Sequence, residues 1–352
     1  MKTILKWPGG KEKELPVIRE NMPDYSGRFV EPFVGGGAVY FDVDNPLCCI
    51  NDKSKELINL YNCAKSRDTD FVKYLCLEND EFTTIGALIS SSRDDILSLY
   101  HSQISIADYL SRYNDVFAAI ARDYHCVFVQ ELNRNLSGKL KRSHKLEKEH
   151  GAIPDSDKLG NVEAALKSAY YMYIRRLHNI RAGFSAGRKA AIYFFVREYC
   201  YSSMFRYNAK GEFNVPYGGI SYNRKDFQKK IDYALSPAIN KKLSGTLICN
   251  LDFEDFLNEL ELVSNDFVFL DPPYDSGFST YARNTFGREE QIRLCECLKR
   301  TKAKIMLVIK NTDFIYFLYK DNFNIKSFEK KYMVSFMNRN DRNVKHLLIT
   351  NY

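Results

Sequence analysis

The most chemically suggestive residues in this 352-residue chain form the run Asp271-Pro272-Pro273-Tyr274, which follows the apolar stretch 267–270. An apolar run that ends in an acid is typical of a buried parallel strand whose carboxyl end faces a ligand. The two prolines have no N–H, so the backbone offers only carbonyl acceptors there. An acid, a carbonyl and an aromatic ring suit a planar amine. The run therefore predicts an amine site, with a proline-rich turn that ends a strand as the alternative.

A second candidate site is the run Phe33-Val34-Gly35-Gly36-Gly37, which follows the apolar stretch 28–30. Consecutive glycines let a backbone turn sharply and approach a ligand closely. Asp52 lies 17 residues after Gly35, where a carboxylate can accept hydrogen bonds from a ribose diol. Position 40 is Tyr instead of the third glycine of the dinucleotide fingerprint, which argues against a nicotinamide cofactor. The pattern predicts a nucleoside pocket, although a tight turn without a ligand has a similar signature.

Both candidate sites lie where strand and helix patterns alternate, at 28–62 and again from about residue 245. The expected strands are 28–30, 46–50, 247–249, 267–270 and 305–309, with a closing antiparallel pair at 331–336 and 345–350. The expected helices are 38–43, 53–63, 252–262, 289–300 and 313–319. Such alternation predicts an α/β fold with a mainly parallel sheet.

The region between these halves has long helical patterns, few strand patterns and two basic stretches. The first stretch is 139–148, with the sequence KLKRSHKLEK. The second is 164–197, which lacks Asp and Glu and contains Lys167, Arg175, Arg176, Arg181, Arg188, Lys189 and Arg197. We therefore expect a discontinuous α/β domain of residues 1–66 and 241–352, interrupted by a mostly helical domain of residues 67–240.

The composition is that of an ordinary globular protein, with 45% hydrophobic residues and a mean hydropathy of −0.38. No apolar run approaches the ~18 residues of a membrane span, and the N-terminus does not resemble a signal peptide, so we expect a cytoplasmic protein. Nine cysteines without CxxC spacing predict reduced thiols rather than a zinc site. The net charge of +7 mildly favours a nucleic-acid partner.

Several segments have a distinctive combination of motifs: LKWPGGK at 5–11, EPFVGGGAVYF at 31–41, FRYNAKGEFNVPYG at 205–218 and DPPY at 271–274, extended by FSTY at 278–281 and the terminal 338–352. Together these segments resemble the Dam-type (D12 class, alpha group) DNA adenine N6-methyltransferases. The glycine motif precedes the recognition region, which precedes DPPY, as in the alpha group. The resemblance covers both ends of the chain and 190–220, and it fails over roughly 67–165.

This resemblance implies a class I (Rossmann-like) S-adenosylmethionine-dependent methyltransferase sheet with an inserted target-recognition domain. The implied enzyme is site-specific and methylates N6 of an adenine flipped out of double-stranded DNA. Its donor is S-adenosyl-L-methionine, which leaves as S-adenosyl-L-homocysteine, and no metal is needed. The implied catalytic residues are Asp271, Pro272, Pro273 and Tyr274. The implied cofactor-binding residues are Trp7, Lys11, Phe33, Gly35, Gly36, Gly37, Asp52, Asp252, Phe253 and Asp271.

The resemblance also implies contacts with DNA. Arg206, Asn208 and Pro216 match a hairpin that reads base edges, and Tyr201 matches a residue that wedges into the duplex. Ser202 stands where family members often have Asn, which leaves the recognition sequence open.

Other residues of the same region have a plainer interpretation. Tyr193, Phe194, Tyr201 and Phe205 have the helical spacing of a core, and only Tyr201 is reassigned by the resemblance. We expect Arg175 and Arg181 to contact phosphates, because their stretch holds no acid to pair with them. A solvated helix face is the alternative for both arginines.

Two other functions remain open. One is methylation of adenine in RNA or of an amide nitrogen in a protein, and the other is a catalytically silent DNA-binding relative. Asp instead of Asn at position 271 argues against the related glutamine methyltransferases, which have NPPY. Intact Lys11, Asp52 and Asp271 argue against a silent site. Expected partners are double-stranded DNA and, as a candidate, a cognate restriction endonuclease; we expect a monomer, without a membrane partner.

Overall fold

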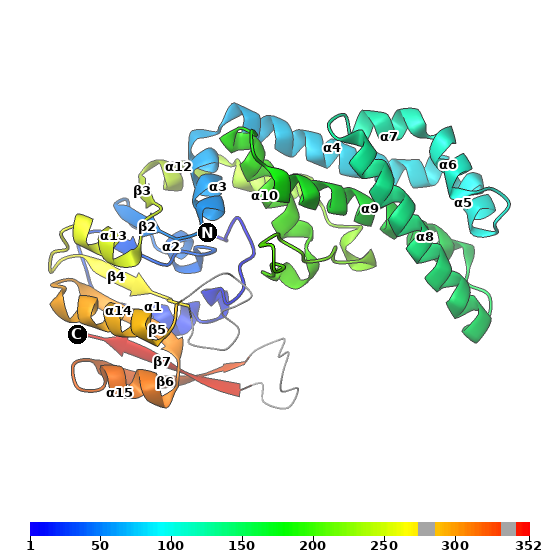
Figure 1. Cartoon of the computed structure of the whole chain (residues 1–352). Coiled ribbons are helices and arrows are strands. Elements are labelled where there is room, and N and C mark those ends of the chain that lie inside the picture. The colour runs from blue at the N-terminus through cyan, green and yellow to red at the C-terminus, as the bar shows by residue number, and fades with distance from the viewer. Residues whose placement is uncertain (274–285, 332–342) are drawn as a thin grey trace. The chain divides into compact units, whose positions relative to one another are not determined.

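The computed structural model describes residues 1–273, 286–331 and 343–352, without the side chains of 329–331 and 343–344. The chain divides into two compact units, residues 1–66 with 236–352 and residues 67–235 (Figure 1). The second unit ends before the expected residue 240, because the segment from 236 packs with the first unit. There the side-chain amide of Asn240 donates to the carbonyl of Lys65 at 2.9 Å.

Seven strands among the described residues of the first unit form one sheet in the order β3-β2-β1-β4-β5-β7-β6. Strands β1 to β5 pair in parallel, and β7 is antiparallel to both β5 and β6. The strands are β1 Phe29–Glu31, β2 Cys48–Asn51, β3 Thr246–Cys249, β4 Phe267–Leu270, β5 Lys304–Lys310, β6 Asn324–Lys331 and β7 Asn343–Thr350. The expected α/β class with a mainly parallel sheet is confirmed.

Helices cover this sheet, and strands β1, β2, β4 and β5 are buried on both faces. The helices of the unit are α1 Leu15–Glu20, α2 Ala38–Asp42, α3 Lys55–Ser66, α12 Pro237–Ser244, α13 Phe253–Glu259, α14 Arg288–Arg300 and α15 Asp313–Tyr319, with the short 3-10 helix η1 Lys11–Lys13. On β5, Ile305, Leu307 and Ile309 join one core cluster with residues of α13, α14 and α15. Met306 and Val308, which alternate with them, are also fully buried.

The closing antiparallel pair differs from the expectation in its first strand. This strand is β6, at Asn324–Lys331, whereas 331–336 was expected, and residues 332–342 lie outside the described part of the chain. The sequence of β6, NIKSFEKK, is too charged to show a buried-strand pattern. It occupies the edge of the sheet, where charged side chains are tolerated and discourage further strand pairing.

The second unit is helical. Its helices are α4 Thr69–Ser91, α5 Arg93–Tyr100, α6 Ile106–Arg112, α7 Asn114–Ile120, α8 His125–His150, α9 Asp155–Ile180, α10 Ala186–Tyr199 and α11 Phe227–Ala234, with the short 3-10 helices η2 Tyr201–Ser203 and η3 Ile220–Tyr222. Helix α10 packs against α4 and α9, and residues 190–200 are all buried. Tyr193 and Phe194 are therefore core residues, whereas Tyr201 is 49% exposed. No helix in the described residues is long and apolar enough to cross a membrane.

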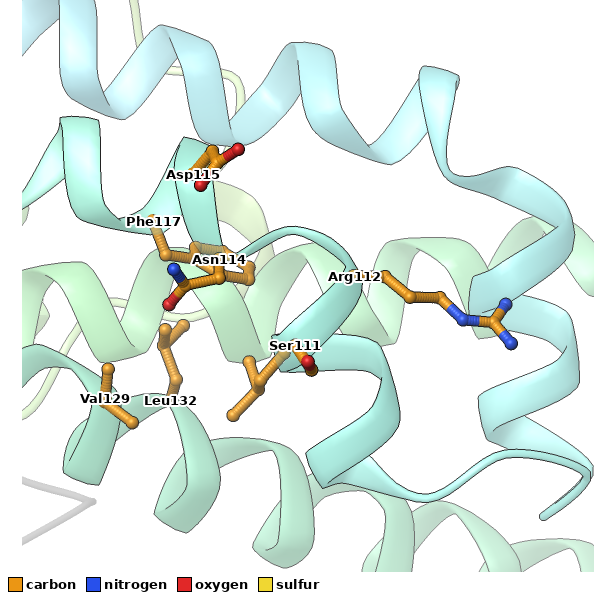
Figure 2. A pocket seen from close by; sticks show the side chains of 8 residues that line it. Ser111, Arg112, Asn114, Asp115, Phe117, Val129 and Leu132 are labelled. Atoms are coloured by element: carbon orange, nitrogen blue, oxygen red, sulfur yellow. The ribbon is translucent and has the colours of Figure 1, made fainter.

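A cavity of about 430 Å³ lies where α6, α7 and α8 meet (Figure 2). Leu110, Phe117, Val129 and Leu132 supply its apolar lining. The guanidinium of Arg112 points away from the other lining side chains and forms an ion pair with Asp95 of α5. The lining therefore offers no convergent charge that would select a ligand.

Candidate active site and DNA-contact region

Three charged side chains meet at the carboxyl ends of β1 and β4. Lys11 is 2% exposed; its Nζ forms an ion pair with Oδ1 of Asp271 and lies 3.3 Å from the carbonyl of Gly9. Glu31, the last residue of β1, is also 2% exposed. Burial and then the nearby Asp271 carboxylate raise the pKa of Glu31 well above its ordinary value, and Lys11 acts in the opposite direction. The buried Lys11 thus forms an ion pair with Asp271 and also opposes the rise in the pKa of Glu31.

The glycine turn passes directly against Trp7. Gly35 has φ +47°, and a Cβ built on it would lie 2.8 Å from Nε1 of Trp7. A Cβ on Gly36 would lie 2.8 Å from the Cβ of the same tryptophan. Gly37, with φ +74°, then turns the chain into α2. Only glycine allows both this backbone conformation and this close approach.

Asp52, which follows the last residue of β2, holds the same turn by hydrogen bonds. One oxygen of its carboxylate accepts from the N–H of Gly35 at 3.0 Å, and the other accepts from the N–H of Ser54 at 2.8 Å. Burial raises the pKa of Asp52, and these two hydrogen bonds oppose that shift. A carboxylate has about four acceptor positions, so roughly two remain for a ligand. Tyr61 holds the turn from another side, because its hydroxyl donates to the carbonyl of Gly35 at 2.8 Å.

Aromatic rings and a capped helix line the neighbouring loop. The rings of Phe33, Phe253 and Phe286 lie within 5.5–5.7 Å of one another, centroid to centroid. Asp252 caps α13 and accepts two hydrogen bonds from Arg293, both at 2.9 Å. Burial alone would raise the pKa of Asp252, but Arg293 holds it below its ordinary value. The carboxylate of Asp252 is therefore already engaged within the protein.

The carbonyl groups of the two prolines after Asp271 have different surroundings. Gln291 of α14 is fully buried, and its side-chain amide donates to the carbonyl of Pro273 at 3.0 Å. Pro272 is buried. Tyr274, the remaining expected catalytic residue, lies outside the described residues, as do Phe278 and Tyr281 of the FSTY segment.

Sequence reasoning missed three positioning residues here. Glu31 and Asn51 each end a buried strand, and this position is the signal that could have found them. The side-chain amide of Asn51 donates to the carbonyls of Pro32 at 3.1 Å and Leu251 at 3.2 Å, which ties two loops of the site together. Gln291 has no local signal, because it lies among charged residues in the first turn of α14.

The expected base-reading residues lie on a hairpin that follows α10. Bridges between Cys200 and Tyr217, and between Tyr207 and Phe213, hold its two arms antiparallel. Arg206 spans the arms, because its Nε and Nη2 donate to the side chain and carbonyl of Asn214 at 2.7 and 2.8 Å.

The other expected contacts of this hairpin are also placed by internal hydrogen bonds. The amide of Asn208 donates to Glu212 at 2.7 Å, and the carbonyl of Pro216 accepts from the N–H of Tyr201 at 2.8 Å. Ser202 is exposed, with φ +51°, a left-handed conformation that Asn adopts more readily than Ser. The hairpin thus brings Tyr201, Ser202, Arg206, Asn208 and Pro216 into one local structure.

The expectation that cations of 164–197 have no acid partner is wrong, because acids from outside this stretch reach them. Lys167 pairs with Glu163 at 2.7 Å, and Arg188 pairs with Asp123 at 2.8 Å. The tertiary structure supplies these carboxylates, and a search within the stretch cannot reveal them.

Two arginines of this stretch also donate hydrogen bonds to main-chain carbonyls. Nη1 of Arg175 donates to the carbonyl of Val215 at 2.9 Å, and burial lowers the pKa of this arginine. Arg197 is 1% exposed and donates to the carbonyls of Ser203 and Met204, both at 2.7 Å. Arg181 lies against the ring of His178, with its Nη1 3.3 Å from Nε2. Arg175 and Arg197 therefore stabilise the hairpin and the segment leading into it through hydrogen bonds to their main-chain carbonyls.

Comparison with known proteins gives relatives that this chain matches over most of their length. The type II methyltransferase M.CviBI of Paramecium bursaria Chlorella virus NC1A is 28% identical over all of both chains. The type II methyltransferase M1.LlaDCHI of Lactococcus lactis subsp. cremoris is 27% identical over all of this chain and 96% of its own. The DNA adenine methylase of Escherichia coli K12 is 23% identical over 89% of this chain and 81% of its own.

A family match covers most of the chain. The family described as D12 class N6 adenine-specific DNA methyltransferase matches residues 7–85 and 147–334. The family match has an internal gap at 86–146, within the 67–165 expected to lack resemblance, although M.CviBI aligns across this gap as well. The matched residues include the glycine turn, the hairpin and the Asp271 loop. The chain belongs to the D12 class N6 adenine-specific DNA methyltransferases.

Proposed function

We propose that this protein transfers a methyl group from S-adenosyl-L-methionine to N6 of an adenine in a short recognition sequence of double-stranded DNA. The observation that carries the proposal is the ion pair between buried Lys11 and partly exposed Asp271 beside the glycine turn. The loop that could accept an amine and the glycine turn that could bind a nucleoside both lie at the carboxyl edge of one sheet. This edge is where α/β proteins bind ligands.

The charges of the site fit a cationic cofactor. Lys11 faces the carboxyl groups of Asp271 and Glu31, and Asp52 is close enough to raise the pKa of Glu31 further. One Oε atom of Glu31 is buried without a hydrogen-bond partner among the described residues. S-adenosylmethionine carries a sulfonium and an ammonium group against one carboxylate. Because the pKa values of Glu31 and Asp52 are raised, a nearby positive charge would stabilise their ionised forms, and the site therefore favours this cofactor over an anionic nucleotide.

The surrounding residues would contact the ribose and the nucleobase of the cofactor. Asp52 has acceptor positions left for the ribose hydroxyls, and Gly35, Gly36 and Gly37 allow close approach of the backbone. Trp7 covers the turn, and the rings of Phe33 and Phe253 offer apolar contact to a nucleobase. Asp252 contributes indirectly in this proposal, because it caps α13 and thereby places Phe253.

Asp271 and Pro272 would bind the amine. Lys11 engages one oxygen of Asp271, and the pair fixes the carboxylate in one orientation. Gln291 engages the carbonyl of Pro273, which leaves the carbonyl of Pro272 as the second acceptor. Two acceptors at the N–H bonds of adenine draw N6 toward tetrahedral geometry and make its lone pair available. Acceptors that are fixed in advance stabilise the positive charge developing on N6.

When bound, S-adenosylmethionine would supply an activated methyl group on its sulfonium and leave as S-adenosylhomocysteine, while Asp271 and Pro272 would hold N6 ready to accept the methyl group. N6 must then lose a proton, and Asp271 is the ionisable group hydrogen-bonded to it in this arrangement. An amine inside the duplex cannot reach this site, so the base has to leave the stack. The proposed role of Tyr274, stacking on that base, rests on the resemblance alone.

The hairpin is the proposed recognition element. Tyr201 is exposed at its base, where an aromatic ring can enter the duplex. Arg206 has the bidentate geometry that reads guanine, and it must exchange its bonds to Asn214 for the base edge. Asn208 and Pro216 lie in the same hairpin. We further propose that the protein acts as a monomer and that a restriction endonuclease shares its recognition sequence.

Product analysis tests this function. The purified protein is incubated with methyl-labelled S-adenosylmethionine and, separately, with genomic duplex DNA, total RNA or a protein mixture. Nucleosides from the digested DNA are identified by mass spectrometry. We expect N6-methyladenine in DNA alone. Label in RNA or protein supports the alternative enzymes, and no label in any sample supports a catalytically silent relative.

A further inference from the structure

Five cationic side chains share one exposed face of α8. This α8 stripe consists of Arg134, Lys141, Arg142, Lys145 and Lys148. At about 3.6 residues per turn, spacings of three, four and seven place residues on one side of a helix. The buried residues Phe128, Leu132, Leu136 and Leu140 lie on the opposite side, and α8 packs against α9. The stripe therefore faces away from the core of the second unit.

Most of the charge on the stripe is not neutralised. Glu131 lies 4.0 Å from Arg134 and Glu149 lies 3.7 Å from Lys145, while both cations are 75% exposed. Within the described residues, no carboxylate is within salt-bridge distance of the other three cations. Exposed pairs of this kind contribute little to stability, so they do not account for a cluster of five cations.

A glycine lies in the middle of the stripe. Gly138 is inside the helix, where glycine is about 1 kcal/mol less favourable than alanine. A Cβ built there would meet only the guanidinium of Arg142, at 3.6 Å or more, so packing does not require glycine. Its absence of a side chain leaves the backbone of α8 open between the cations, where a large polyanion can approach.

The stripe begins next to the hairpin. Burial lowers the pKa of Arg175, and Arg134 and Arg206 are near enough to act in the same direction. Arg175 holds the hairpin through Val215, so the first cation of the stripe lies near the recognition element. From Arg134 the stripe extends about 20 Å along α8, at ~1.5 Å per residue. Duplex DNA carries one negative charge per ~1.7 Å of its axis.

We propose that the α8 stripe binds the sugar–phosphate backbone of duplex DNA outside the recognition sequence and lengthens the duplex that the protein holds. This inference rests on the proposed function in taking DNA as the substrate. Residues 86–146, which include four of the five cations, form the internal gap of the family match. The stripe thus adds a contact that the matched segments do not supply.

Neutralisation with a charge-matched control tests the proposal. The stripe variant carries Lys141→Gln, Lys145→Gln and Lys148→Gln, which remove three charges and nearly preserve helix propensity. The control variant carries Lys241→Gln, Lys302→Gln and Lys320→Gln, three exposed residues of the first unit. Thermal unfolding verifies that both variants are folded. Fluorescent random-sequence duplexes of about 12 base pairs, close to one helical turn, and of about 40 base pairs are titrated at several salt concentrations.

The stripe variant should bind the long duplex about tenfold more weakly, and its salt slope should fall by about 2–3, at ~0.9 per lost phosphate contact. The control variant should retain the wild-type slope, and the short duplex should show a smaller difference between the two variants. Equal affinity and slope for the two variants on the long duplex would overturn the proposal.

Methyl incorporation into genomic DNA separates this inference from the proposed function. If the wild-type protein methylates DNA but the stripe variant behaves like the control variant, the stripe proposal fails and the function stands. If the stripe variant loses its salt slope but the wild-type protein transfers no methyl group, the stripe is a DNA-binding surface and the catalytic proposal fails.

Discussion

The carboxyl edge of the sheet and the basic stretch 164–197 both contain residue types that suggest a ligand, but the structure uses their charges differently. At the sheet edge, Lys11 is buried beside Asp271 and Glu31, with acceptor capacity left over. In 164–197, Arg197 is 1% exposed and bonded to two main-chain carbonyls of its own unit. A cationic stretch in a sequence is therefore not by itself evidence of a binding surface, because the fold can use its charges internally.

The helical unit repeats this contrast within itself. Helix α8 exposes its cations, whereas α9 and α10 direct Arg175, Arg188 and Arg197 to partners inside the unit. Both basic stretches carry an excess of cations, but the surroundings of those cations are opposite. The predictions below test this difference, beginning with the largest expected effect.

Replacement of Arg197 by Met should destabilise the second unit by about 3 kcal/mol, because two buried carbonyls lose a charged donor. The exposed Arg176 provides the matched control, and Arg176→Met should change stability by less than about 0.5 kcal/mol. Chemical denaturation followed by circular dichroism measures both variants. Equal effects of the two substitutions would remove the distinction between structural and exposed cations.

Asp52→Ala should weaken binding of S-adenosylmethionine by about 1–3 kcal/mol, because ribose hydroxyls would lose their acceptor. The same change frees the N–H of Gly35, so the variant also tests how far the turn depends on this carboxylate. Calorimetry with the cofactor and with NAD measures the effect. An unchanged affinity, or equal binding of NAD by the wild-type protein, would argue against this pocket.

Arg206→Ala should reduce binding to the preferred site by about 1–3 kcal/mol and relax discrimination at one base pair. Arg175→Ala should weaken binding to cognate and mismatched duplexes alike, because Arg175 supports the hairpin through Val215. Titrations on cognate and single-mismatch duplexes at several salt concentrations separate the two roles. A salt slope that falls by about one unit in Arg175→Ala would show a phosphate contact as well.

The smallest expected effect concerns Glu81, a partly buried acid of α4. Burial raises the pKa of Glu81 to about 7, although the hydroxyl of Tyr170 donates to it at 2.6 Å. Unfolded Glu titrates near ~4.3, so the folded state binds the extra proton between these values. The stabilisation is present below about pH 4 and is lost as the pH rises through 7.

Glu81→Gln should therefore become more stable relative to wild type as the pH rises from about 5 to 8. Melting temperatures across this range measure the difference, and Glu20→Gln, at an exposed position of α1, is the control. A pH-independent difference between wild type and Glu81→Gln would show that the carboxyl group titrates normally in the folded protein.

The sheet and its ligand edge were largely predictable, because apolar runs, glycines and terminal acids are local signals. Asp52, the glycine turn and Asp271 follow strands at 48–51, 29–31 and 267–270, close to their expected positions. Gln291, the acid partners Glu163 and Asp123, and the bond from Arg206 to Asn214 were not predictable. These contacts depend on how helices pack or on how the hairpin closes, which single-chain periodicity does not specify.

The most direct test of the central claim is the single-turnover rate of N6-methyladenine formation by Asp271→Ala. Removing one pre-aimed acceptor at the reacting nitrogen typically lowers the rate by ~10²–10³-fold. We expect at least that loss, a milder loss for Asp271→Asn, and a folded protein by circular dichroism. If Asp271→Ala retained more than about a tenth of the wild-type rate, the assignment of Asp271 as the amine acceptor would be contradicted.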